Sequence, residues 1–100
     1  MIIKIPAIPP LSKTSDYLQR RDEFDAKARA ATDGLVAPAR CSVSVEISQR
    51  RRVGRLDSRV RVVLKSLARV GFLKENRVDV LRCGFGRHGR DQTKVRINEH

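Results

Sequence analysis

The sequence RRRVGRLDSRVRVVLKSLARVGFLKENRVDVL, residues 50–81, contains the pattern that decides the fold. After a basic run, apolar residues recur at helical spacing as far as Val70, which predicts an amphipathic helix. Its apolar stripe consists of Val60, Val63, Leu64, Leu67 and Ala68. Asp57 or Ser58 is expected to cap the start of this helix, and Gly71 is typical of the position just past a helix end.

The segments on either side of this helix have the pattern of strands. Over 41–48, the side chains of Cys41, Val43, Val45 and Ile47 alternate with polar ones, as in a strand with one buried face. Weaker patterns predict a first strand over 2–5, a third strand over 78–85 and a last strand over 93–97. The glycine-rich basic segment between the last two predicts a turn, so we expect them to pair as a hairpin.

An earlier helix is expected over 15–32, with Asp33 and Gly34 as its stop signal. Its candidate caps are Thr14, Ser15 and Asp16, and the residues near one face are Tyr17, Phe24, Ala28, Ala31 and Leu35. The proline-rich segment 6–13 is expected to be a loop that packs across a sheet edge. The order β-α-β-α-β-β predicts one α+β domain over 1–100, with two helices packed on a mixed sheet.

The charge of the chain is high and unevenly distributed. The net charge is +11, and residues 1–49 hold seven Lys and Arg against six Asp and Glu, whereas residues 50–100 hold fifteen against five. Ten of the eleven net positive charges therefore belong to the second half. This asymmetry favours a polyanionic partner, with nucleic acid as the first candidate, and the alternative is a surface that only keeps the protein in solution.

Membrane and secreted classes fit the sequence poorly. No apolar run approaches the roughly 20 residues that span a bilayer, and the first residues lack the apolar core of a signal peptide. We therefore expect a cytoplasmic protein without a membrane partner. Cys41 and Cys83 lie far apart in strand-like segments and are expected to be reduced, buried thiols, because a zinc site needs more ligands at closer spacing.

Four segments together resemble the RusA-like Holliday-junction resolvases, small homodimeric, magnesium-dependent endodeoxyribonucleases of bacteria and their phages. IKIPAIPPLSKTSDY (3–17) is similar to the family's opening strand and loop, and APARCSVSVEI (37–47) to the strand before its active site. RLDSRVRVVLKSLARVGFL (55–73) is similar to its aspartate motif and helix, and KENRVDVL (74–81) to the segment with paired aspartates. The resemblance implies a homodimer that resolves four-way DNA junctions by paired nicks, in recombination and repair, in a bacterial cell or encoded by a phage.

The resemblance also implies the residues of an active site. Asp57 matches the second aspartate of the motif and Glu75 the paired aspartates, so both are candidate ligands for Mg²⁺ or Mn²⁺. Arg61 replaces the lysine of the family's helix and is expected to position the scissile phosphate. The candidate catalytic residues are thus Asp57, Glu75 and Arg61, and Asp79 is the next carboxylate after Glu75.

Two positions depart from the family's motif. Arg55 stands where the family has its first aspartate, and Ser58 where it has an asparagine. A monovalent and a divalent cation about 4 Å apart repel by roughly 8 kcal/mol at an effective dielectric constant of 20. We therefore expect weaker metal binding than in typical members, and the alternative is a catalytically inactive relative that serves as a nucleic-acid-binding module.

The basic residues in and before the central helix are the expected phosphate contacts. They are Arg50, Arg51, Arg52, Arg55, Arg61, Lys65 and Arg69. Taken alone, Asp57 also fits an ordinary helix cap and Glu75 a solvated loop acid. A small basic RNA- or ribosome-associated protein is a third alternative, although the scarcity of aromatic residues argues against sequence-specific recognition of single strands.

Overall fold

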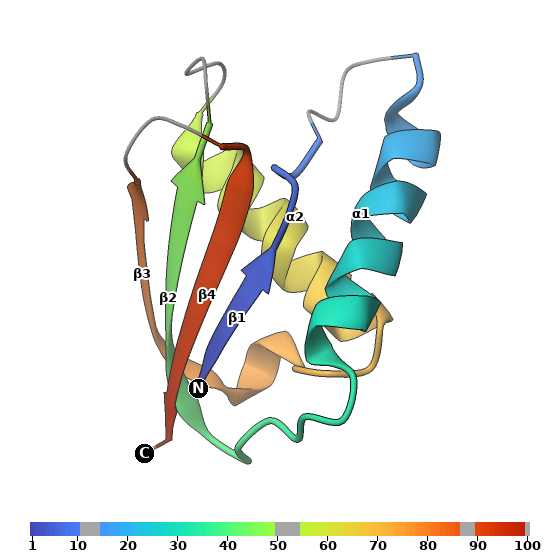
Figure 1. Cartoon of the computed structure of the whole chain (residues 1–100). Helices are drawn as coiled ribbons and strands as arrows, with labels where there is room; N and C mark the ends of the chain where they lie inside the picture. The colour runs from blue at the N-terminus through green and yellow to red at the C-terminus, as the bar shows by residue number, and fades with distance from the viewer. Residues whose placement is uncertain (11–14, 50–54, 87–89, 100) are drawn as a thin grey trace.

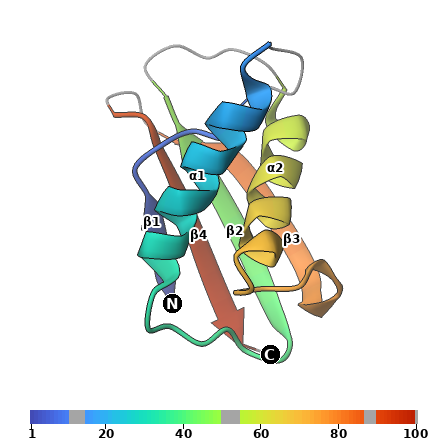
Figure 2. The ribbon, with the colours of Figure 1, turned by 90° about the vertical axis from the view of Figure 1, so that its right-hand side faces the viewer.

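A computed structural model describes residues 1–10, 15–49, 55–86 and 90–99 (Figure 1). Its elements are β1 (Ile2–Ile5), α1 (Tyr17–Thr32), β2 (Cys41–Ser48), α2 (Leu56–Arg69), a short 3-10 helix η1 (Glu75–Arg77), β3 (Val78–Phe85) and β4 (Gln92–Glu99). The strands form one sheet, and both helices lie on the same face of it (Figure 2). The predicted α+β class and the order β-α-β-α-β-β are confirmed.

The order of strands in the sheet is β1-β4-β2-β3. β2 and β3 are parallel, whereas β4 runs antiparallel to both β1 and β2. The expected hairpin between the last two strands is therefore wrong. Because α2 connects two neighbouring parallel strands, β2, α2 and β3 form a βαβ unit that leaves β3 at the edge. β4 takes the free side of β2, where it gains a partner on each side and buries Val95 and Ile97.

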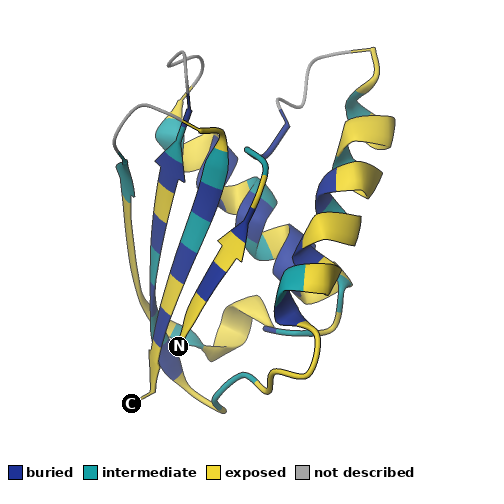
Figure 3. Cartoon of the chain, viewed as in Figure 1, coloured by how far each residue is buried: buried dark blue, intermediate teal, exposed yellow. Residues whose placement is uncertain are grey.

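The core lies between the sheet and the two helices. Along β2, Val43, Val45 and Ile47 are at most 1 % exposed and belong to one core cluster with buried residues of both helices, as the period of two predicted. Figure 3 shows buried bands that alternate along the strand. In the described part of the chain, the apolar residues of the buried core cluster are aliphatic except for Cys41 and Phe24. Most of the stabilisation thus comes from burying Val, Ile and Leu, at about 25 cal/mol per Å² of apolar surface.

α1 begins two residues later than predicted, and its core face is shorter. Phe24 and Ala28 are buried, but Leu35 is 41 % exposed because the helix ends at Thr32 and Leu35 no longer follows the helical spacing. Asp16 is the N-cap but makes no side-chain capping bond; its carboxylate accepts a hydrogen bond from Arg20 Nε at 2.7 Å instead. The candidate cap Thr14 lies outside the described residues.

The end of α2 follows the prediction. Gly71 has φ +77°, and its amide donates to the Ala68 carbonyl while the Phe72 amide donates to the Leu67 carbonyl. This pair of bonds is the Schellman motif, which favours glycine because a side chain is strained at positive φ. Ala68, which the sequence placed on the apolar stripe, is exposed.

The two cysteines have different environments. Cys41 is buried in β2, where burial first and the charge of Asp79 second raise the pKa of its thiol. Cys83 is exposed, contrary to the prediction, because β3 is the edge strand and the helices do not cover its side chain. Among the described residues, no helix combines the length and apolar character needed to cross a bilayer.

Candidate nucleic-acid interface

α2 presents a basic face on the side away from the sheet. Val60, Val63 and Leu67 are buried against the core, whereas Arg61 and Lys65 are exposed. Four helical residues rise about 6 Å, so these two cations form a short row along the helix. This is the face on which the sequence predicted phosphate contacts.

The start of α2 differs from the prediction in its cap. The helix begins at Leu56, so the N-cap is Arg55 and not Asp57 or Ser58. Arg55 has extended backbone angles, φ −88° and ψ 140°, and makes no side-chain capping bond. Its exposed guanidinium therefore lies at the positive end of the helix dipole, where an acid is favoured. Asp57, in the first turn, has the favourable charge for that position.

Arg69 is exposed, as Arg61 and Lys65 are, but it also has a structural partner. Its Nε and Nη2 donate to the two carboxylate oxygens of Asp25 on α1, at 2.8 and 3.0 Å. The buried Ser66 hydroxyl donates to the same carboxylate at 2.5 Å. Burial acts to raise the pKa of Asp25, but these hydrogen bonds and the charges of Arg69 and Arg21 together outweigh it and hold the pKa below its ordinary value. We call this ion pair the clamp between the helices, while the predicted contact of Arg69 with phosphate stays a prediction.

The structure separates the two candidate metal ligands. Asp57 lies in the first turn of α2, and Glu75 begins η1, beyond the other end of α2. Val78, three residues after Glu75, pairs with Cys41 at the start of β2, whereas α2 begins after the end of β2. The two carboxylates therefore lie at opposite ends of the sheet and of a helix that rises about 18 Å between Asp57 and Arg69 (Figure 2), so one ion cannot contact both in a single chain. Asp79 does not supply a second ligand beside Asp57, because it lies on β3 and accepts hydrogen bonds from Arg40. Within the described ranges, no three His, Cys, Asp or Glu residues lie close enough to hold a metal.

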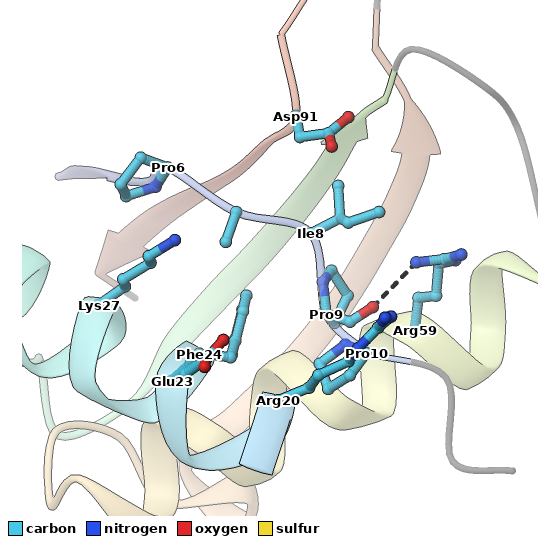
Figure 4. Close-up of a pocket in the computed structure, with 11 residues that line it drawn as sticks. Pro6, Ile8, Pro9, Pro10, Arg20, Glu23, Phe24, Lys27, Arg59 and Asp91 are labelled. Carbon is cyan, nitrogen blue, oxygen red and sulfur yellow. Dashed lines mark hydrogen bonds between the residues drawn. The ribbon is translucent and has the colours of Figure 1, made fainter. Parts of the chain in front are cut away.

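A pocket missed from the sequence lies where the proline-rich segment meets both helices (Figure 4). Arg59, on the first turns of α2, is 3 % exposed, and its Nη1 donates to the Pro9 carbonyl at 2.9 Å. Burial lowers the pKa of Arg59, and the nearby charge of Asp91 acts in the opposite sense. The pocket is lined by Pro6, Ala7, Ile8, Pro9, Pro10, Arg20, Glu23, Phe24, Lys27, Arg59 and Asp91.

The role of Arg59 was recoverable from helical spacing. It stands four residues before Val63, so it falls on the buried side of α2. Its bond to Pro9 holds the segment after β1 against the helix, which is consistent with a structural function. Arg50, Arg51 and Arg52, predicted to contact phosphate, lie outside the described residues.

Comparisons with known proteins assign no family. No model of a protein family matches the chain, and no curated protein matches it.

Proposed function

We propose that this protein binds branched DNA through its phosphate backbone and does not cut it. One observation carries the proposal: α2 presents Arg55, Arg61 and Lys65 to solvent, while the two candidate metal ligands lie at opposite ends of the same helix. The helix thus carries cations suited to binding phosphate, but the two carboxylates do not meet within one chain to form a metal site. The preference for branched DNA comes from the resemblance to RusA-like resolvases.

The charge distribution supports backbone contact over base reading. A short row of Arg and Lys recognises phosphates, which carry no sequence information directly. Each phosphate neutralised releases counterions, so affinity should fall steeply as salt rises. A homodimer with two such helices related by a two-fold axis would suit a four-way junction, and the proposal places the protein in the cytoplasm of a bacterium.

The alternative function, a nuclease, requires carboxylates from two protomers to form one metal site. Magnesium-dependent nicking by Asp57 and Glu75 would require the carboxylate of one protomer to meet that of its partner, because the two lie too far apart in one chain. The same assay therefore tests both functions. It follows binding and nicking of a synthetic four-way junction and of a matched duplex, with and without Mg²⁺ or Mn²⁺.

The binding test compares two double variants with the same change in charge. Arg61→Gln/Lys65→Gln removes the exposed row, and Arg29→Gln/Lys74→Gln removes two exposed cations elsewhere. We expect the row variant to lower the slope of log affinity against log salt by about 1.8, at about 0.9 per phosphate contact. The control should leave the slope nearly unchanged. If both double variants lowered the salt slope equally, the effect would come from net charge and not from the row. Metal-dependent cutting that Asp57→Asn abolished would establish the nuclease instead.

A further inference from the structure

The face of the sheet that the helices leave uncovered is also basic. Both helices lie on one side of the sheet (Figures 1 and 2), so alternate side chains of the strands point away from them. On this face β1 and β4 contribute Lys4, Lys94 and Arg96, and β3 contributes Arg82, whose strand partner Ser44 points the same way. None of these residues is buried, and α2 lies on the opposite side of the sheet (Figure 2).

The strand register places two arginines on either side of a serine. Ser44 of β2 is opposite Arg96 on β4 and opposite Arg82 on β3. Adjacent strands are about 4.8 Å apart, so the two arginine backbones are about 10 Å apart, with a short hydroxyl side chain between them. The three residues line one shallow hollow together with Ser42, Val43, Val80 and Asn98.

A second cross-strand row extends the same surface. Lys4 of β1 is directly opposite Lys94 of β4, an arrangement of like charges that destabilises a sheet. Glu46, on the other side of Lys94, is the one acid on these two rows in the described part of the chain and offsets part of that charge. The row is next to the arginine row, since Ser44, Glu46, Lys94 and Arg96 line an adjoining hollow. The cations exceed the acid four to one on these two rows, which favours a bound anion.

The chemistry of this face distinguishes its possible occupants. A second copy of the chain would bring Arg82 and Arg96 against like charges, so self-association there is disfavoured. A bilayer surface would need a broad apolar face, which these two rows do not supply, although the exposed Ile2 stands opposite Arg96 at the end of one of them. A phosphodiester chain fits, because guanidinium groups bind phosphate oxygens in a two-pronged manner and serine hydroxyls donate to them.

We propose that the uncovered sheet face is a second binding site for the nucleic-acid backbone, with Arg82, Arg96 and Ser44 at its centre. The molecule then contacts nucleic acid on two opposite sides, through α2 and through the sheet. One protein can therefore hold two DNA segments together. The inference depends on the proposed function only for the kind of polyanion bound, because the sheet residues are independent of α2.

The test isolates the sheet face by working in the Arg61→Gln/Lys65→Gln background. Binding of a 30-base-pair duplex is measured by fluorescence anisotropy across a salt series. Adding Arg82→Gln/Arg96→Gln should lower the salt slope by about a further 1.8, and adding Arg29→Gln/Lys74→Gln should not. Arg82→Lys/Arg96→Lys keeps the charge and should restore most of the slope. Far-UV circular dichroism checks that every variant is folded.

A bridging assay then separates the inference from the proposed function. Duplex fixed to beads should capture a second, labelled duplex through the wild-type protein, and either double variant should weaken capture, because each chain then keeps only one of its two sites. If the sheet variant changes neither slope nor capture while the α2 variant does, the inference is wrong and the proposed function stands. The reverse pattern keeps the sheet site and overturns the role of α2. Displacement by polyglutamate as efficient as by DNA, at equal charge, would overturn the assignment to nucleic acid.

Discussion

Replacing Arg55 by serine should stabilise the protein and weaken its binding to DNA. Arg55 is the N-cap of α2, and its backbone angles, φ −88° and ψ 140°, already suit a capping residue. The first-turn amides of Asp57 and Ser58 have no acceptor within the helix, and Arg55 supplies none from its side chain. A serine hydroxyl at this position can accept one of these bonds without moving the backbone.

The size of the effect follows from the missing cap. A capping side chain is worth about 1 kcal/mol relative to alanine, so Arg55→Ser should be about 1 kcal/mol more stable than Arg55→Ala. For a domain of this size that difference corresponds to a melting temperature higher by about 4–8 °C. Both variants lose one cation of the proposed interface, so both should lower the salt slope of DNA binding by about 0.9.

The matched pair separates the two effects. Thermal and urea unfolding followed by circular dichroism measure stability, and anisotropy over a salt series measures binding. If Arg55→Ser is no more stable than Arg55→Ala, the cap is not the missing interaction. If neither variant changes the salt slope, Arg55 does not contact phosphate and its place at the N-terminus of α2 has no functional reason.

Three further predictions concern the stability of the fold. Arg69→Ala should lower the free energy of unfolding in urea by about 1–3 kcal/mol, because it leaves the half-buried Asp25 carboxylate without its charged donor. As the control, Arg61→Ala at an exposed position should change that free energy by no more than about 0.5 kcal/mol. Equal losses in the two variants would contradict the clamp. Since the pKa of Asp25 is lowered in the folded state, its contribution to stability should be complete above about pH 4 and decline as the pH falls through the folded pKa. In unfolding curves measured from pH 2 to 6, the free energy of unfolding should therefore fall less steeply toward low pH in Asp25→Asn than in the wild type. Gly71→Ala should cost about 1–2 kcal/mol because of the positive φ, whereas a neutral result in thermal unfolding would show that the helix end shifts to avoid it.

Local patterns in the sequence were enough to predict the elements. The spacing of Val60, Val63 and Leu67 indicated α2, and the alternation along Cys41–Ser48 indicated β2, because the side chains of a helix or strand repeat with a fixed period. Gly71 marked the helix end for an equally local reason, the strain of a side chain at positive φ. The exposed Arg61 and Lys65 followed from the same periodicity.

Those local patterns could not predict which strands pair. The sequence placed the last strand beside the third as a hairpin, but the parallel βαβ unit puts β3 on one side of β2 and β4 on the other. Pairing depends on which residues distant in the chain become neighbours, and the period of a strand carries no information on its partner. The same pairing leaves β3 as the edge strand and thereby exposes Cys83.

Periodicity and composition were enough to predict the helices, the strands, the α+β class and the excess of positive charge in the second half of the chain. The places where those charges and acids meet depend on the tertiary structure. The length of α2 places Asp57 and Glu75 at opposite ends, Asp25 draws Arg69 into the interface between the helices, and the register of three strands brings Arg82 and Arg96 to either side of Ser44. The last two depend on contacts between segments far apart in the chain, which only folding brings together.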